Sequence, residues 1–183
     1  FTVVKTNGFD VKLASTENVS LSIGRDLRIT GGTLVMNGAS SSFAVPSSSL
    51  SVARDLAISG TGSFYNTNEY ASGAGVPAVN VAGDINITGS AGQRLIIAGA
   101  KTGFATSPSS AVINLTGDFS LTGTGTMTVS ESPASGTLFV AGNFIHSNGV
   151  IERNAGNADI VFNGTTPQFY TSGGTITTAV DFT

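Results

Sequence analysis

The chain has no cysteine and a single histidine among its 183 residues, and only 10% of the residues are charged. The absence of cysteine excludes disulfide bonds, thiolate metal sites and thiol nucleophiles, and it leaves the cellular compartment open. No apolar run approaches the ~20 residues of a membrane-spanning helix, so we expect no membrane span. Phe1 to Val4 do not form a signal peptide, and an exported protein would have its signal outside this sequence.

Positive charge is also sparse, with eight Lys and Arg residues against eleven acidic residues and a net charge of −3. The basic residues are scattered from Lys5 to Arg153 and form no stripe, which excludes nucleic acid as a partner. Solubility must come from Ser, Thr, Asn and Gly. Such neutral side chains suit stacked strands, because at ~4.8 Å spacing they do not repel one another as like charges would.

What the chain does contain is a phrase that returns five times. It reads apolar-x-apolar, a small or basic residue, Asp or Asn, then apolar-x-apolar closing on Gly or Asn, as in Val79-Asn-Val-Ala-Gly-Asp84-Ile-Asn-Ile-Thr-Gly89. The aligned residues Asp26, Asp55, Asp84, Asp118 and Asn143 stand 29, 29, 34 and 25 residues apart. Repeats at this spacing are typical of a stacked solenoid.

Within each phrase apolar and polar residues alternate with a period of two, which predicts strands with one side-chain set inward and the other facing water. A further short apolar stretch follows each phrase and predicts a third face. These stretches begin at Leu34, Phe64, Leu95, Met127 and Val150. Glycines between the stretches can adopt the positive φ that sharp corners require.

The sequence therefore predicts an all-β fold with essentially no helix. We expect a single-stranded, right-handed parallel β-helix (β-solenoid) of about five to six coils with 25–34 residues each. One domain would span residues 1–183, with a partial first coil at 1–18, five repeat coils at 19–157 and a divergent last coil at 158–183. Neither end shows a charged or helical cap, which predicts a segment of a longer array or a unit that stacks end to end.

Segments of variable length, rich in Ser, Ala, Gly and Asn, separate the third face from the next phrase. They span 37–49, 66–78, 98–111 and 130–137, and they contain Pro46, Pro77, Pro108 and Pro133 in turn. Proline removes a donor from a strand ladder and suits an irregular connector. The segments are predicted to lie along one edge of the solenoid.

The runs Val-Ala-Gly-Asp84-Ile-Asn-Ile-Thr-Gly, Leu-Thr-Gly-Asp118-Phe-Ser-Leu-Thr-Gly and Ile-Val-Phe-Asn163-Gly-Thr-Thr-Pro-Gln168 resemble the repeats of very large secreted surface proteins of Bacteroidetes-type bacteria. They also resemble the β-solenoid passenger regions of autotransporter and filamentous adhesins. The resemblance covers roughly Val19 to Thr178. It implies an exported right-handed β-helix that acts as a stalk, fibre or adhesin, and it carries no catalytic motif.

The row of Asp26, Asp55, Asp84 and Asp118 has two interpretations. Stacked carboxylates could coordinate Ca²⁺, which takes 6 to 8 oxygen ligands. Alternatively, each carboxylate accepts hydrogen bonds from nearby backbone N–H groups in an Asx-type turn, which Asn143 can also make. We favour the structural interpretation, because Asn replaces Asp in the row and the Gly-rich nonapeptide of Ca²⁺-binding β-rolls is absent.

Parallel β-helices also include polysaccharide lyases and glycosidases, which need two carboxylates, or a carboxylate with a basic residue, in a cleft. Acids outside the row include Glu17, Glu69, Glu131, Glu152 and Asp159, and no two of these five share a repeat position. His146 aligns with Ile and Leu residues and is predicted to point inward. The sequence shows no Gly-x-Ser-x-Gly motif and no phosphate-binding loop. We therefore expect no enzyme activity and no cofactor.

Aromatic residues of the variable segments offer a possible binding surface. Phe43 and Phe104 precede the prolines of their segments and are predicted to stack inside the coil. The stretch from Tyr65 to Tyr70 places two tyrosines around polar residues and is our candidate for an exposed recognition patch. Its predicted ligand-binding residues are Tyr65, Asn66, Asn68, Glu69 and Tyr70.

A single coil cannot bury enough apolar surface to be stable alone, so neighbouring coils must share a core. This favours a non-enzymatic, extracellular structural or adhesive β-solenoid on a bacterial cell surface. Its partners would be neighbouring repeats, copies of itself stacked end to end, or surface glycans. A carbohydrate-active β-helix of the lyase or tailspike type is the alternative, and a trimeric phage or virion fibre is a third possibility.

Overall fold

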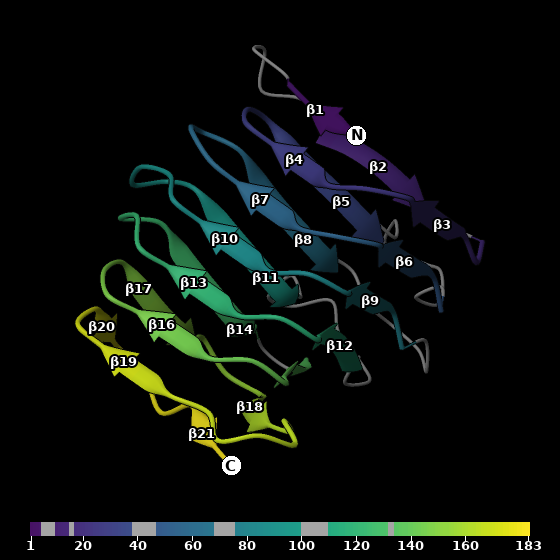
Figure 1. Cartoon of the computed structure of the whole chain (residues 1–183). Helices are drawn as coiled ribbons and strands as arrows, with labels where there is room; N and C mark the ends of the chain where they lie inside the picture. The colour runs from purple at the N-terminus through teal and green to yellow at the C-terminus, as the bar shows by residue number, and fades with distance from the viewer. Residues whose placement is uncertain (5–9, 15–16, 38–46, 68–75, 100–109, 132–133) are drawn as a thin grey trace.

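The computed structural model describes residues 1–4, 10–14, 17–37, 47–67, 76–99, 110–131 and 134–183. Within these ranges the chain forms 21 β-strands and no helix. Successive strands belong in turn to three sheets, and every pairing is parallel. The coils stack into a β-solenoid of about six turns (Figure 1). The predicted fold class, an all-β parallel β-solenoid, is confirmed.

We name the three seven-stranded sheets A, B and C. Sheet A contains β1 (Thr2–Val3), β4 (Leu27–Ile29), β7 (Leu56–Ile58), β10 (Ile85–Ile87), β13 (Phe119–Leu121), β16 (Phe144–His146) and β19 (Tyr170–Ser172). Sheet B contains β2 (Asp10–Ala14), β5 (Thr33–Asn37), β8 (Ser63–Thr67), β11 (Arg94–Ala98), β14 (Thr126–Ser130), β17 (Val150–Arg153) and β20 (Thr175–Ile176). Sheet C contains β3 (Ser20–Ile23), β6 (Ser49–Val52), β9 (Ala78–Val81), β12 (Ser110–Leu115), β15 (Ser135–Val140), β18 (Asn157–Phe162) and β21 (Asp181–Phe182).

Each repeat phrase turns the corner between sheet C and sheet A. Its first half forms a strand of sheet C and its second half a strand of sheet A, as in β9 and β10. The apolar stretch that follows forms the third face, sheet B, as predicted. Both ends of the chain continue the same sheets, since β1 and β2 pair with β4 and β5, and β19 to β21 pair with β16 to β18.

The interior consists of columns in which each coil covers the inward side chains of the next. In sheet A, Leu27, Leu56, Ile85, Phe119 and Phe144 stand in register and are all fully buried. The rings of Phe119 and Phe144 stack with their centroids 4.6 Å apart. Because these contacts run between coils, the hydrophobic stabilisation belongs to the stack and not to any single coil.

Two corners between sheets A and B show why glycine is required there. Gly60, between β7 and β8, has a φ of 60°, and Gly149, between β16 and β17, has a φ of 74°. A side chain is rarely tolerated in this left-handed region. These positions confirm the predicted use of corner glycines.

Sheet B differs from the other two sheets because several outward side chains of its middle strands are also buried. Val35 and Thr128 are completely buried, and Ile96 is 2% exposed. The chain passes from sheet B to sheet C through the segments of variable length. The predicted residues Phe43, Pro46, Phe104, Pro108 and Pro133 lie outside the described residues.

Candidate functional site

The aspartate row lies at the corner between sheets C and A, immediately before each strand of sheet A. The carboxylate of Asp55 accepts a hydrogen bond from the backbone N–H of Asp84 at 3.0 Å, and that of Asp84 accepts one from Asp118 at 2.9 Å. Asp118 in turn accepts from the N–H of Asn143 at 2.6 Å, and the side-chain oxygen of Asn143 accepts from Phe169 at 3.0 Å. We call Asp55, Asp84, Asp118 and Asn143 the aspartate ladder, since each residue bonds its coil to the next.

The ladder depends on a glycine that precedes the donor residue at three positions. A Cβ atom on Gly117 would collide with the Asp84 carboxylate and lie 2.7 Å from the carbonyl carbon of Gly83. Gly83 and Gly142 face the carboxylates of Asp55 and Asp118 in the same way. Only a residue without a side chain lets the carboxylate approach the backbone of the next coil this closely.

Asp26 differs from the rest of the row in its main partners. One coil later, Arg54 stands where a glycine stands at the other positions. The Asp26 carboxylate pairs with Arg28 at 3.0 Å and with Arg54 at 3.5 Å. The hydrogen bond from Arg28 lowers the pKa of Asp26 below its usual 3.8, outweighing the opposite effect of burial, and the charge of Arg54 adds to the lowering. At the other positions of the row, the carboxylate accepts from the backbone N–H one coil later. For Asp26 that donor is Asp55, and its hydrogen bond makes the smallest contribution to lowering the pKa of Asp26.

These contacts identify what the aspartates do. The prediction that the aspartates accept backbone N–H hydrogen bonds is confirmed for Asp55, Asp84 and Asp118. The predicted Asx-type turn is wrong for these residues, because each donor lies one coil later and not in the same turn. Within the part of the chain that the structure describes, no three His, Cys, Asp or Glu side chains group together as metal ligands. The ladder is therefore an element of the architecture.

His146 points inward, as predicted, and is fully buried between Leu121 and Ser172 of the neighbouring coils. Its Nε2 atom lies 3.4 Å from the carbonyl oxygen of Gly149, while Nδ1 has no partner in the described structure. Burial lowers the pKa of His146, and the Gly149 carbonyl opposes this effect only in part. Because its side chain is fully buried, His146 is not accessible to a substrate as a general base.

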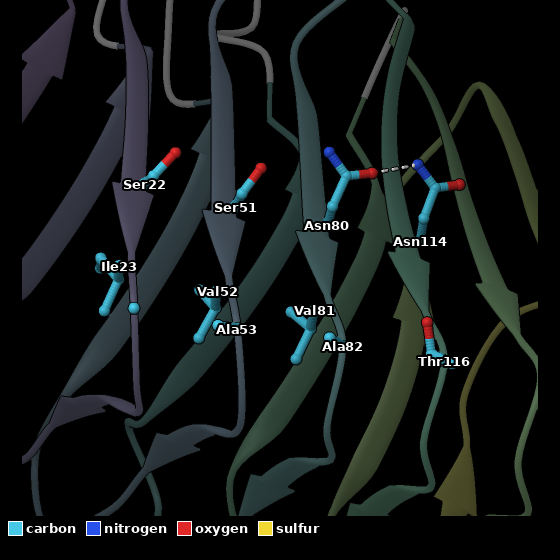
Figure 2. A pocket seen from close by; sticks show the side chains of 11 residues that line it. Ser22, Ile23, Ser51, Val52, Ala53, Asn80, Val81, Ala82, Asn114 and Thr116 are labelled. Carbon is cyan, nitrogen blue, oxygen red and sulfur yellow. Dashed lines mark hydrogen bonds between the residues drawn. The ribbon is translucent and has the colours of Figure 1, made fainter.

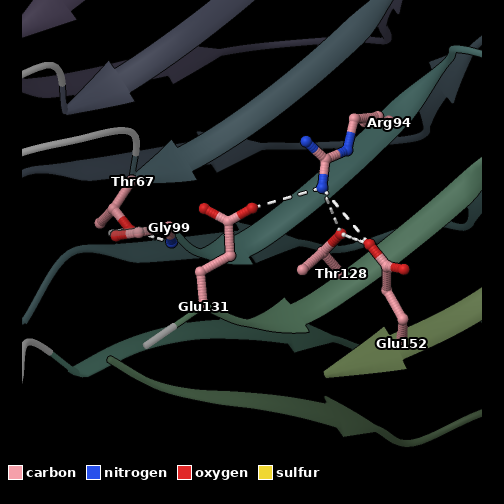
Figure 3. A network of polar contacts seen from close by, with 6 residues as sticks. All are labelled: Thr67, Arg94, Gly99, Thr128, Glu131 and Glu152. Atoms are coloured by element: carbon pink, nitrogen blue, oxygen red, sulfur yellow. Dashed lines mark hydrogen bonds and ion pairs between the residues drawn. The ribbon is translucent and has the colours of Figure 1, made fainter. Parts of the chain in front are cut away.

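Two acids that the repeat alignment separates come together on the outer face of sheet B. Arg94 of β11 donates through one guanidinium nitrogen to Glu131 at 3.3 Å and to Glu152 at 3.4 Å (Figure 3). Thr128 of β14 accepts from the same nitrogen at 2.9 Å and donates to Glu152 at 2.9 Å. Glu131 and Glu152 do not share a repeat position, yet they lie close together because the long side chain of Arg94 reaches both of them.

The predicted patch from Tyr65 to Tyr70 is divided by the structure. Tyr65 points outward from β8 and is half-buried, and burial raises its pKa while the nearby charge of Arg94 opposes the rise. Asn68, Glu69 and Tyr70 lie outside the described residues. The exposed patch as a whole therefore stays a prediction.

For Asn66 the expectation of an exposed side chain is wrong. This residue is fully buried and stands in the inward column between Met36 and Ile97. Its amide nitrogen donates to the carbonyl oxygen of Val112 at 3.1 Å and to that of Pro77 at 3.5 Å, which joins sheet B to sheet C. The period of two could have revealed this inward orientation, because Asn66 aligns with apolar residues in neighbouring coils.

A groove of about 410 Å³ lies over the outer face of sheet C near its corner with sheet A (Figure 2). It is lined by Ser22, Ile23, Gly24, Ser51, Val52, Ala53, Asn80, Val81, Ala82, Asn114 and Thr116. Ser22, Ser51, Asn80 and Asn114 stand in register on four adjacent strands, and we call them the polar column. Sequence reasoning missed this site, although each member is the middle residue of the first apolar-x-apolar half of a phrase.

Comparisons with protein-family models, with curated proteins and with solved structures found no match to this chain. Among the described residues no helix is long and apolar enough to cross a membrane. The features that bear on function are therefore the architecture, the aspartate ladder, the groove and the Arg94 cluster, which consists of Arg94, Thr128, Glu131 and Glu152.

Proposed function

We propose that the chain is a non-enzymatic, extracellular structural or adhesive β-solenoid that displays binding surface at a bacterial cell surface. The observation that carries this proposal is the in-register stacking of all three sheets around one shared core. Such a stack lengthens by one strand spacing with each coil, which suits a stalk or fibre. The resemblance to secreted surface repeats and adhesin passengers supports the same conclusion.

Several polar groups that could have formed an active site make structural contacts instead. The ladder carboxylates accept backbone hydrogen bonds, and Glu131 and Glu152 are held by Arg94. The partners would be further coils or a second copy stacked on β19 to β21, where Tyr170 and Ile176 are 44% and 41% exposed. Exposed apolar strand edges recruit further strands.

An antibody raised against the folded chain tests the location. It should label intact, unpermeabilised cells of the source organism, and protease added outside those cells should remove the label. Labelling that appears only after permeabilisation would overturn the proposal. A full-length gene product with many further copies of the phrase would support the stalk.

The alternative, a carbohydrate-active β-helix, is favoured by one observation: Arg94 brings a basic group and two carboxylates together. Incubation with acidic and neutral polysaccharides distinguishes the two functions. We expect no new reducing ends and no unsaturated products. Product release that disappears in Glu131→Gln or Glu152→Gln would instead identify a lyase or glycosidase. Obligate trimers in native mass measurements would favour a fibre of the phage or virion type.

A further inference from the structure

The polar column presents one neutral hydrogen-bonding side chain per coil along the axis of the solenoid. Adjacent members are paired in register from β3 to β12, so they are separated by one strand spacing of ~4.8 Å. All four side chains are exposed. Figure 2 shows them projecting from successive strands on the same side of the sheet. A ligand that contacts all of them must be extended and must run across the strands.

Most of the hydrogen-bonding capacity of the column is free. Asn114 donates to Asn80 at 2.9 Å, which leaves the Asn80 amide nitrogen and the Asn114 amide oxygen available. Within the described residues, the hydroxyl groups of Ser22 and Ser51 have no hydrogen-bond partner. The column therefore offers both donors and acceptors, as a ligand rich in hydroxyl groups requires.

The groove carries no charge, since none of its lining residues is acidic or basic. Gly24, Ala53 and Ala82 form its opposite side and are too small to fill it. Backbone recognition of a peptide is excluded here, because strands β6 and β9 are paired on both edges and only their faces are accessible. The groove thus favours an uncharged ligand that binds through hydroxyl groups and flat apolar faces.

The column continues onto an aromatic side chain. Phe139 of β15 is the register partner of Asn114, and it is half-buried and points to the same side. An aromatic face packs well against the apolar face of a sugar ring, and its burial contributes much of the affinity at such sites. A ligand that follows the polar column therefore reaches a stacking platform at the next strand.

We propose that the groove over sheet C binds an unbranched, neutral polysaccharide laid along the solenoid axis. The polar column contacts the hydroxyl groups of successive sugars, and Phe139 stacks on one ring. The repeat of an extended β-linked chain is close to one strand spacing, so each coil contacts about one sugar. This inference goes beyond the proposed function, and it requires no catalysis and no particular cellular location.

Titration of the full chain with β-1,4-linked oligosaccharides of glucose, mannose and xylose, from two to eight units long, tests the site. We expect affinity to rise up to about five units, the number of side chains in the column with Phe139, and then to level off. Side-chain amide resonances of Asn80 and Asn114 should shift on binding. The double variant Asn80→Ala/Asn114→Ala should weaken binding about tenfold, because each lost hydrogen bond reduces affinity severalfold.

Asn86→Ala is the matched control, since Asn86 is an outward amide of the same coil on sheet A. It should bind as the parent does, and thermal melting would establish that all variants fold. The proposal is overturned if no oligosaccharide of the panel binds, if the Asn86 variant loses affinity equally, or if anionic polygalacturonate binds more tightly than every neutral chain. It is also overturned if the double variant changes only self-association in sedimentation, which would assign the groove to a second copy.

Discussion

The backbone N–H of Asp118 donates a hydrogen bond of 2.9 Å to the carboxylate of Asp84, although 34 residues separate them in the sequence. The bond crosses from one coil to the next at the corner between sheets C and A. The negative charge of the carboxylate strengthens such a hydrogen bond. A buried N–H donor left without an acceptor would lower the stability of the folded protein. The ladder therefore holds the corners of successive coils together, while strand pairing holds the sheets together.

Replacing Gly117 by alanine should destabilise the protein by about 1 to 3 kcal/mol, because the new Cβ atom would collide with the Asp84 carboxylate and the Gly83 backbone. Urea denaturation followed by circular dichroism measures this change.

Gly24→Ala is the matched control for that substitution. No neighbouring atom lies within 4 Å of the place that a Cβ atom on Gly24 would occupy, so its replacement should change the unfolding free energy by less than about 0.5 kcal/mol. Equal losses in the two variants would show that the close approach at Gly117 has no special role.

Removal of the Asp84 side chain tests the ladder itself. Asp84→Ala leaves the N–H of Asp118 without its acceptor and should cost about 1 to 3 kcal/mol. Asp84→Asn should lose less, because its amide oxygen can accept the same bond, as Asn143 does for Phe169. An alanine variant as stable as the asparagine variant would contradict the assigned role.

Chelation separates the ladder from a calcium site. Because the carboxylates bind backbone N–H groups, excess EDTA should leave the melting temperature unchanged, and added Ca²⁺ should not raise it. A calcium-dependent rise in melting temperature that is lost in Asp84→Asn would restore the metal interpretation, since ligand binding to the native state stabilises it.

His146 should make stability depend on pH. Burial lowers the pKa of the folded-state imidazole below the usual 6.5, so the unfolded chain binds the proton more readily. The stabilisation from the neutral side chain is complete above pH 6.5 and declines as pH falls from there towards the folded-state pKa. The slope from this single group is at most about 1.4 kcal/mol per pH unit.

Thermal melting of the parent and His146→Leu between pH 8 and pH 5 checks that effect. Leucine occupies the aligned position one coil earlier, at Leu121, so it fits the column. The melting temperature of the variant should fall less than that of the parent as the pH is lowered. Identical pH profiles for both proteins would rule out His146 as its source.

Arg94→Met should destabilise the chain by about 1 to 2 kcal/mol at neutral pH, because two partly buried carboxylates lose their shared cation. Arg25, an exposed arginine without an ion pair in the described structure, provides the control variant. If Arg25→Met lowered the unfolding free energy as much as Arg94→Met, the proposed stabilisation by the Arg94 cluster would be contradicted.

The sequence predicted the strands and the sheets because both follow from local periodicity. Leu27 and Ile29 alternate with polar residues, and the same pattern in every coil places equivalent residues in register. The inward orientation of His146 was predictable for the same reason. Asn66 was misplaced because its polarity was given more weight than its position in the alternation.

Contacts between coils were harder to predict. The partners of Asp84 and Arg94 depend on which atoms of two coils approach each other, and the repeat alignment does not contain that information. Gly117, which precedes Asp118, is visible in the sequence. The reason for a glycine there becomes clear only when the position of the Asp84 carboxylate, one coil earlier, is known. The groove was also missed, because its members are ordinary solvent-facing residues until the coils are stacked.

Through the ladder, an added coil would form the same hydrogen bond to its neighbour as the coil before it. Duplication of a gene segment encoding a single winding would extend the molecule by one increment, without redesigning any existing contact. The length of such a protein can therefore change in discrete steps during evolution, while the three-sheet arrangement of its core stays the same.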